Sequence, residues 1–328
     1  MGWERVLEQI RRDRRSGASV LLARGVEAAR RFLALTRTLP PARLGRALEQ
    51  FTLRLTTGQP SMAAFLSLAN ALWLARGEGG KRPPPWESLH GALVRFADGI
   101  DRGLGLTVRH GAALVRSRSL VLTYSNSTAV RLALWRAMAA GRRFEVVCSE
   151  SRPMREGVAL ARQVAALGIP VHLVVDAALA EWIHRADLVL LGADAVMSEA
   201  VVNKVGTEPL LRAAQRAGVR AYVLADRSKW LPDALAEFWR IREEAPEEVA
   251  RPGVPTLRVH NRYFGTSPLA LVTGLVWEGG VARPADVRRR ITRLPVSKGL
   301  VRLLARGRAA GNRGDGQLTA RGRNPIAQ

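Results

Sequence analysis

Apolar side chains in the first part of the chain recur at helical spacing. Over residues 6–29 they return every three or four positions, which is the period of one helix face. The same spacing continues in three further stretches, at about 41–56, 61–75 and 88–116. Residues 77–87 (GEGGKRPPPWE) interrupt it with Gly and Pro and predict a loop. We therefore expect a helical N-terminal domain over residues 1–117.

From residue 118 the pattern changes to short, continuous apolar runs separated by helix-length segments. The runs are rich in β-branched residues and read SLVLTY, FEVVCS, IPVHLVVD, ADLVLLGAD, RAYVLAD and TLRVH. Continuous apolar strands between helices indicate a parallel sheet covered on both faces. Right-handed crossovers then give an α/β, Rossmann-like, doubly wound domain, which we place at 118–305. Residues 306–328 are polar, basic and glycine-rich, so we expect a disordered tail.

The net charge of +23 changes the picture of what the protein binds. Arginine supplies 47 of the 51 basic residues, and lysine stands only at 81, 204, 229 and 298. A positive field favours anionic partners such as phosphate esters or RNA. A general bias toward arginine, with solvated charges spread over the surface, is the alternative, and no aromatic-plus-basic RNA motif is present. Where arginine replaces lysine so freely, a surviving lysine indicates a site that needs a compact ammonium.

Several classes of protein and site lack support in the sequence. No apolar run reaches the roughly 18–20 residues of a membrane helix, and the charged N-terminus has no signal-peptide core, so we expect a cytoplasmic protein. The one cysteine, Cys148, excludes an internal disulfide and a zinc ribbon. The five histidines show no ligand spacing, and neither GxGxxG nor a P-loop is present. We expect no cofactor and no metal.

Polar residues follow three of the predicted strands, where an open parallel sheet binds its ligands. They are the segments 125–128 (SNST), 150–153 (ESRP) and 203–207 (NKVGT). A helix N-terminus offers free N–H groups and partial positive charge, and so attracts phosphate. In the third segment Asn203 can donate, Lys204 adds a charge, Gly206 permits close backbone approach and Thr207 can cap the next helix. Simple helix capping is the alternative explanation.

Two further residues at strand ends carry candidate chemistry. Asp194 follows four apolar residues and a Gly-Ala pair, so its carboxylate should be partly desolvated, with a raised pKa suited to proton transfer. A capping or loop aspartate is the alternative. Cys148 lies in an apolar strand, where a lone cysteine is usually a small core residue, although a chemical role stays open.

Four segments of the second domain resemble a known family. They read VLTYSNSTAV, SESRPMREGVALARQVAALGIPV, ADLVLLGADAVMSEAVVNKVGT and NRYFGTSPLALVTGLVWEGGV. They are similar to the alpha, beta and delta subunits of eukaryotic translation initiation factor 2B and to the related methylthioribose-1-phosphate and ribose-1,5-bisphosphate isomerases. The N-terminal RRDRRSGASVLLA and QPSMAAFLSLANAL resemble the helical-domain motifs of the same group. The resemblance implies a helical domain on a Rossmann-like domain, a homodimer or higher homo-oligomer, and a possible protein partner.

The resemblance also implies site residues. In the isomerases an Asp of the GAD motif and a Cys of a THCN motif act as an acid–base pair on a sugar 1-phosphate. Asp194 matches the Asp, whereas Ser125 occupies the Cys position, and a serine hydroxyl is a far poorer acid than a thiol.

Departures from the isomerase pattern also include Gln59, Glu156, Gly265 in place of a common acidic residue, and the lack of an asparagine–glycine pair before Asn203-Lys204. Gln59 stands where the isomerases have an arginine, and Glu156 replaces a glutamine, so that a carboxylate would oppose a phosphate. The phosphate contacts that remain are Arg15, Arg152, Asn203 and Lys204.

Three functions follow as hypotheses. The first is a protein that binds a sugar phosphate or nucleoside monophosphate without isomerase turnover. The second is an aldose–ketose isomerase acting on ribose 1,5-bisphosphate or 5-methylthioribose 1-phosphate, with Asp194 as acid and base. The third, more weakly supported, uses the basic charge to bind RNA.

Overall fold

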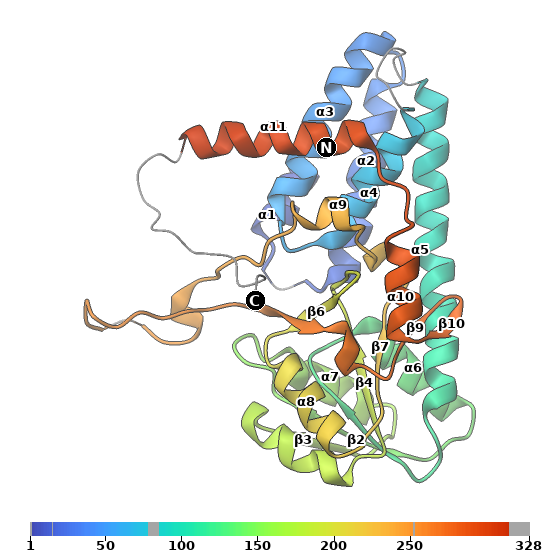
Figure 1. Ribbon diagram of the computed structural model, residues 1–328, viewed down its shortest axis with the longest axis vertical. Helices are drawn as coiled ribbons and strands as arrows, with labels where there is room; N and C mark the ends of the chain where they lie inside the picture. The colour runs from blue at the N-terminus through green and yellow to red at the C-terminus, as the bar shows by residue number, and fades with distance from the viewer. Residues whose placement is uncertain (1, 15, 78–84, 252, 315–328) are drawn as a thin grey trace.

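The N-terminal part of the chain is a helical domain, as the apolar spacing predicts. The structure, a computed structural model, describes residues 2–14, 16–77, 85–251 and 253–314 (Figure 1). The domain contains α1 (Trp3–Arg12), α2 (Ala18–Thr36), α3 (Pro41–Gly58), α4 (Ala63–Ala75) and the first turns of α5 (Trp86–Leu114). Its core includes the stacked rings of Phe32 and Phe51, with the Trp3 ring edge-on to both. The buried Trp73 indole satisfies its N–H on Thr52 Oγ1 at 2.8 Å.

The second part contains a seven-stranded sheet in the order β10-β9-β7-β4-β1-β2-β3. Its strands are β1 (Leu120–Thr123), β2 (Glu145–Ser149), β3 (Val171–Val174), β4 (Leu188–Gly192), β7 (Ala221–Leu224), β9 (Gly274–Trp277) and β10 (Gly280–Ala282). All neighbours pair in parallel except β9 with the edge strand β10. The chain starts at β1, builds outward to β3, and then returns to β4 on the other side of β1. The β1–β4 boundary is therefore the switch point where doubly wound folds bind ligands.

Helices cover both faces of this sheet, which confirms the predicted fold class. The helices of this part are α6 (Thr128–Ala139), α7 (Glu156–Ala165), α8 (Thr207–Arg216), α9 (Asp233–Ala236), α10 (Pro284–Ile291) and the 3-10 helix η1 (Asp176–Arg185). One face packs against α5, α6 and α7, and the other packs against η1, α8 and α10. Neighbouring residues of one strand pack on opposite faces of the sheet. Cys148 lies on the side of α5, α6 and α7, and Val147 lies on the side of η1, α8 and α10.

A small antiparallel sheet lies beside the carboxyl end of the large one. It has the order β5-β6-β8, with β5 (Ala195–Val196), β6 (Ala200–Lys204) and β8 (Phe264–Pro268). The backbone N–H of Asp194 donates to Val202 O at 2.8 Å, which holds the chain leaving β4 against β6. Ala195 and Val202 join the core of the helical domain, so this sheet connects the two parts of the chain.

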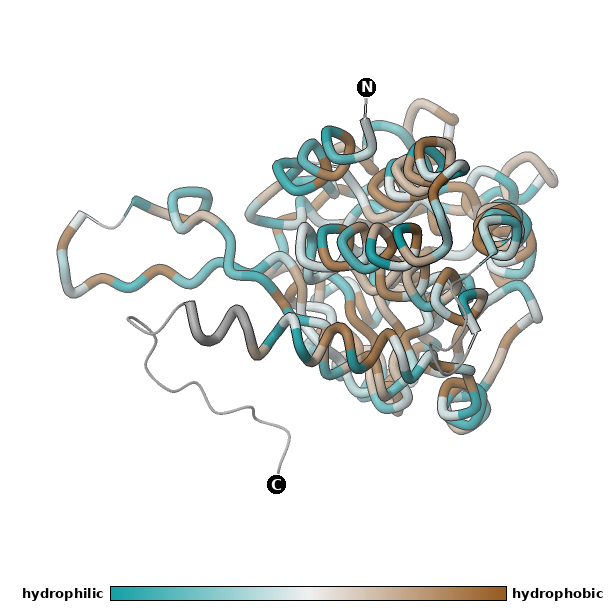
Figure 2. Tube along the Cα trace, turned by 90° about the horizontal axis from the view of Figure 1, so that it is seen from above, coloured by the Kyte–Doolittle hydropathy of each residue, from teal (hydrophilic) through white to brown (hydrophobic). Residues whose placement is uncertain are grey.

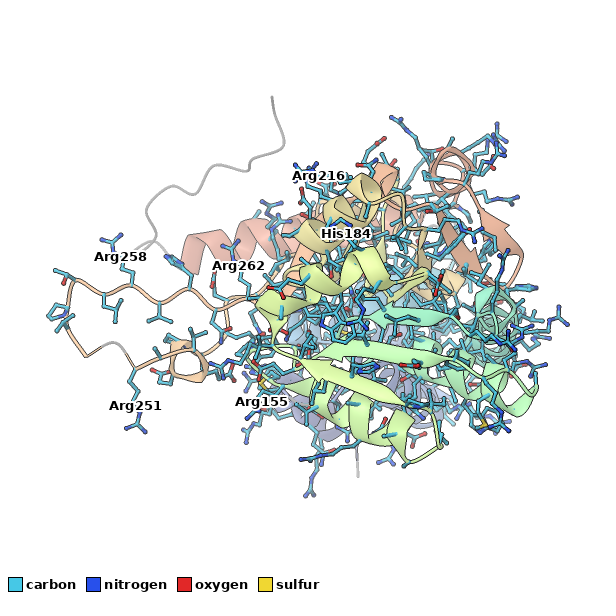
Figure 3. All side chains as sticks on the ribbon, turned by 90° about the horizontal axis from the view of Figure 1, so that it is seen from below. Arg155, His184, Arg216, Arg251, Arg258 and Arg262 are labelled. Carbon is cyan, nitrogen blue, oxygen red and sulfur yellow. The ribbon has the colours of Figure 1, made fainter. Side chains whose placement is uncertain are left out.

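Two sequence expectations are wrong. TLRVH (256–260) forms no strand and lies instead in an arm, residues 245–251 and 253–260, that extends from the body (Figures 2 and 3). Most of its residues are exposed, and β-propensity without a pairing partner does not make a strand. The predicted tail is also too long, because residues 306–314 continue α11 (Lys298–Gly314), whose Leu300 and Leu304 pack into the helical core. Residues 315–328 and most of the predicted loop 77–87 lie outside the described residues.

Candidate functional site

A cavity of about 190 Å³ lies at the switch point of the sheet. Its walls come from the segment after β1 (125–128), the end of β4 (192–194), the end of β6 (203–204), and the α1–α2 connection with the start of α2 (13–19, apart from residue 15). The helical domain therefore closes a cleft that the parallel sheet opens. A second, smaller contribution comes from the 3-10 helix η2 (Arg227–Lys229), which brings in Lys229.

Ser125, Glu156 and Lys204 form a connected polar group in this cavity. Lys204 Nζ lies 2.8 Å from Glu156 Oε1, and the Ser125 hydroxyl donates to the same oxygen at 3.0 Å. The Lys204 ammonium is 2% exposed and also lies over the Tyr263 ring, 5.3 Å from its centroid. A buried ammonium needs such compensation. The charge of Lys204 is therefore largely committed inside the protein.

The backbone at Ser125 is held in an uncommon conformation. Its φ of 68° lies in the left-handed region, which non-glycine residues seldom adopt. The Ser125 N–H donates to Ser151 Oγ at 3.0 Å, and Ser151, with φ 63°, is itself fixed by the Asp176 carboxylate. Such backbone strain collects at functional sites, where the surrounding structure maintains it. The hydroxyl of Ser125 is thus aimed at Glu156 by the fold.

Asp194 and Lys229 are two further charged groups that line the cavity. Burial raises the pKa of Asp194 from 3.8 to about 6; Glu156 adds to the rise, and Lys229 and Lys204 oppose it. A raised pKa is the shift expected for Asp194 from its place at the end of an apolar strand. Among the described residues, neither Asp194 nor Lys229 has an ion-pair partner within 4.0 Å. Both groups are available to a ligand.

The starts of two long helices line the cavity. Gly17, Ala18 and Ser19 belong to the start of α2, and Ser127 and Thr128 to the start of α6. Ser127 caps α6 by accepting from the Val130 N–H. Backbone N–H groups at such ends, with the helix dipole, favour an anion. Two helix starts and the Lys229 ammonium therefore converge on one small volume.

The remaining charges of the cavity neutralise one another. Glu244 lies 2.7 Å from Arg242 and 3.6 Å from Arg14. Asp13 pairs with Arg24 at 2.6 Å. Gln59, at the position where the resemblance implies an arginine, donates to the carbonyls of Ile10 and Asp13 at 2.8 Å. Gln59 therefore positions the α1–α2 connection.

The residues predicted from the sequence divide into four groups, of which the last, Gly206 and Thr207, does not line the cavity. Ser125, Asp194, Asn203 and Lys204 all line the cavity. The Arg152 side chain lies in a different hollow and donates to Glu248 O. Arg15 lies outside the described residues.

Gly206 and Thr207 stand behind the cavity wall. Gly206, not Thr207, is the N-cap of α8, so the expected capping role of Thr207 is wrong: its hydroxyl donates to Lys204 O at 2.6 Å and accepts from the Asn203 amide. Gly206 has φ 96°, and a Cβ there would lie 2.9 Å from Tyr124 Oη. A glycine is therefore required at position 206, because a side chain would be strained at this φ and would contact Tyr124 too closely.

Two other observations concern residue types that carry chemistry. Cys148 is fully buried in the core, and burial raises the pKa of its thiol to about 11, which leaves it unreactive. The only signal in the sequence that points to Lys229 is the rarity of lysine: two of the three described lysines line the cavity.

In the part of the chain that the structure describes, no cluster of His, Cys, Asp or Glu could hold a metal ion, and no helix is long and apolar enough to cross a membrane.

Comparison with known proteins identifies the family. A sequence profile of the initiation factor 2 subunit family matches residues 14–284. The chain belongs to this family. The match covers most of the α1–α2 connection and every strand that borders the cavity.

Relatives within the initiation factor 2 subunit family carry two kinds of name. A translation initiation factor eIF-2B subunit 2-like protein of Pyrococcus abyssi is 28% identical over 280 residues, 85% of this chain and 95% of that protein. Ribose 1,5-bisphosphate isomerase of Archaeoglobus fulgidus is 33% identical over 181 residues, 53% of this chain and 57% of the isomerase. The crystal structure of a Pyrococcus horikoshii OT3 translation initiation factor eIF-2B superposes with a TM-score of 0.73 at 26% identity, covering 88% of this chain and 98% of that one. The family thus includes isomerases and initiation-factor-like proteins.

Proposed function

We propose that this protein binds a phosphorylated sugar or a nucleoside monophosphate in the cavity and does not isomerise it. The observation that carries the proposal is the hydrogen bond from the Ser125 hydroxyl to Glu156 Oε1. The residue that replaces the isomerase thiol is a weak acid, and its proton is engaged with a carboxylate that Lys204 already neutralises. No strong proton donor therefore faces Asp194 from this side.

The cavity favours a small ligand with both phosphate and hydroxyl groups. Its volume of about 190 Å³ is below the ~300–1,000 Å³ of drug-sized pockets, which favours one phosphorylated sugar over a larger nucleotide. Lys229 and the starts of α2 and α6 would hold the phosphate. Glu156 Oε2 is buried without a hydrogen-bond partner among the described residues, and a sugar hydroxyl would supply the missing donor.

Binding and its dependence on Lys229 test the proposal. Calorimetric titration with ribose 1,5-bisphosphate, 5-methylthioribose 1-phosphate, AMP and orthophosphate should give binding of at least one sugar phosphate. Lys229→Gln should weaken that binding by about tenfold or more, because hydrogen bonds to charged groups contribute about 1.5–3 kcal/mol. Lys298→Gln, at an exposed lysine on α11, is the matched control and should bind like the wild type. Equal losses in both variants, or no binding, would refute the proposal.

The isomerase alternative draws on one observation, the pKa of about 6 at Asp194, which suits an acid–base group near neutrality. Turnover of either sugar phosphate by the wild type, abolished in Asp194→Asn, would establish it and exclude a binding-only role. Under our proposal the wild type shows no turnover, and Ser125→Cys keeps ligand affinity while restoring the missing thiol.

We also propose a homodimer or higher homo-oligomer, as the family resemblance implies. Light scattering coupled to size exclusion would decide it: a monomeric mass at micromolar concentration contradicts the proposal.

A further inference from the structure

A second concave surface lies at the opposite edge of the large sheet, where its parallel strands begin. Two adjoining hollows, of about 640 and 250 Å³, share Arg118, Ser119 and Asp187. They run past the first residues of β1, β2, β3, β4 and β7. The cavity described above opens at the carboxyl ends of the same strands, so the two sites are separated by the length of the sheet.

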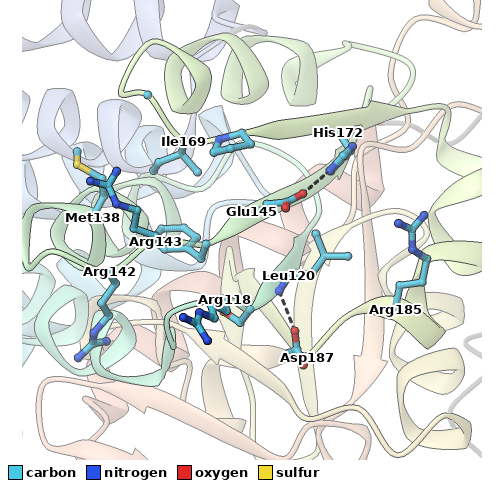
Figure 4. A pocket seen from close by; sticks show the side chains of 14 residues that line it. Arg118, Leu120, Met138, Arg142, Arg143, Glu145, Ile169, His172, Arg185 and Asp187 are labelled. Atoms are coloured by element: carbon cyan, nitrogen blue, oxygen red, sulfur yellow. Dashed lines mark hydrogen bonds and ion pairs between the residues drawn. The ribbon is translucent and has the colours of Figure 1, made fainter.

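Arginine dominates this amino-edge surface. The hollows are lined by Arg116, Arg118, Arg142, Arg143, Arg185 and Arg220. In Figure 4 Arg118, Arg142 and Arg143 gather on one side of the larger hollow, and Arg185 lies on the opposite side. Guanidinium groups present planar, paired donors that match phosphate oxygens.

Most of these guanidinium groups have no hydrogen-bond or ion-pair partner among the residues that the structure describes. Arg142 donates to the carbonyls of Ala112 and Val115 and is part of the fold. The other five are exposed. Among the described residues, none of them has a side-chain hydrogen bond or ion pair; Arg185 only stacks on the Trp182 ring.

The two carboxylates of the surface do not neutralise these arginines. Glu145 Oε2 lies 2.8 Å from His172 Nε2, and Asp187 accepts from the Leu120 N–H at 2.8 Å (Figure 4). The surface therefore presents five exposed guanidinium groups beside two carboxylates that already have other partners. Such an excess of one sign in a concave surface concentrates anions of the opposite sign.

The floor of the larger hollow is apolar. Met138, Phe144, Ile169 and Pro170 line it between the arginines. A volume of about 640 Å³ is within the range of small-molecule pockets. Phe144 is buried and the partly exposed His172 ring is held by Glu145, so these hollows present no row of free exposed rings on which successive unpaired bases could stack, as single-stranded RNA requires. Shape and composition thus favour a compact ligand over a nucleic acid strand.

We propose that this amino-edge surface binds a small molecule that carries a polyphosphate chain. Arg118, which lines both hollows, and Arg143 hold the phosphates, and Arg116, Arg185 and Arg220 surround them. Inorganic polyphosphate and a nucleoside triphosphate share this chemistry; only the second also uses the apolar floor. This site is separate from the cavity of the proposed function and does not depend on it.

A charge-matched pair of variants tests the site. Tripolyphosphate and ATP are titrated into the wild type, into Arg118→Gln/Arg143→Gln, and into the control Arg30→Gln/Arg46→Gln, whose exposed arginines lie on α2 and α3. The first variant should lose about tenfold or more in affinity, because it removes two charge-assisted contacts, while the control stays within about twofold. Tighter binding of ATP than of tripolyphosphate identifies the nucleotide as the ligand, and equal affinities identify the polyphosphate chain.

Four outcomes would overturn the proposal. One is the absence of binding of both probes at low ionic strength. Another is an equal loss of affinity in the two double variants, which would show that the overall charge of the protein, and not these two arginines, determines binding. The third is binding of a single-stranded oligonucleotide without either probe, which would assign the surface to RNA. Lys229→Gln should leave probe binding unchanged; a loss there would place the probes in the other cavity, and so would also refute the amino-edge site.

Discussion

Replacing Asp194 by Asn should stabilise the folded protein at neutral pH. The carboxylate is desolvated at the end of β4, and its pKa of about 6 shows that the folded state holds this proton more tightly than the unfolded chain, where the ordinary value is 3.8. Ionising Asp194 therefore costs the folded state free energy. The amide of Asn keeps nearly the same shape and never ionises.

The size of the effect follows from the two pKa values. A rise from 3.8 to about 6 corresponds to about 3 kcal/mol of free energy of unfolding lost at pH 7. At pH 4.5, where the folded state keeps its proton and the unfolded chain has mostly lost it, the loss is only about 1 kcal/mol. Because the pKa of Asp194 is higher in the folded state, the loss of folding free energy is absent below about pH 3.8. It develops as the pH rises and is complete above about pH 6.

Denaturant unfolding between pH 4.5 and pH 8 measures this directly. The free energy gained by Asp194→Asn should grow by about 2 kcal/mol between pH 4.5 and pH 7. Asp98→Asn, at an exposed position on α5, is the matched control and should show no such growth. A variant that is less stable than the wild type at pH 7, or a gain that does not vary with pH, would refute the reasoning.

Three other substitutions and one reaction have definite expected results. Glu156→Gln removes the charge that Lys204 now neutralises but keeps a polar group that can hydrogen-bond a sugar hydroxyl, so affinity for a sugar phosphate should rise by about tenfold in calorimetry; weaker binding would contradict the assigned pairing. Cys148, with its pKa raised from 9 to about 11, should react with a thiol reagent at pH 8 at least about a hundredfold more slowly in the folded protein than in urea, and equal rates would contradict its burial. Gly157→Ala places a Cβ 1.8 Å from a backbone carbonyl and should cost about 4 kcal/mol or more in denaturant unfolding. Gly99→Ala, with open space around its Cβ, should stabilise α5 by about 0.5–1 kcal/mol, and similar effects at the two glycines would contradict the packing.

The strand-end part of the site was predictable from the sequence. Continuous apolar runs located β1 and β4, and the rule that ligands bind at their carboxyl ends selected Ser125 and Asp194. The rule depends only on chain order and strand direction, both of which local patterns reveal. The TLRVH segment shows the limit of such patterns, because a strand also needs a partner, and the arm provides none.

The rest of the site depends on which segments meet in three dimensions. No local pattern announces that the start of α2 and the 3-10 helix carrying Lys229 face the same volume. The commitment of Lys204 to Glu156 was equally hidden, since it requires two side chains 48 positions apart to reach 2.8 Å. The sequence reasoning assigned Lys204 to the ligand because it had no means of seeing its counterion.

The helix α5 has a consequence for how the molecule can be divided. Leu89 and Leu93, near its start, belong to the core of the helical domain, whereas Ala112, near its end, belongs to the core on one face of the sheet (Figure 1). A cut between residues 117 and 118 respects the change in sequence pattern, but it strips that face of the helix that covers it. A fragment beginning at residue 118 would expose apolar surface along the sheet and aggregate. The two halves should therefore unfold in one transition. A fragment that contains the sheet should begin before α5, and a fragment that contains the helical domain should end after it.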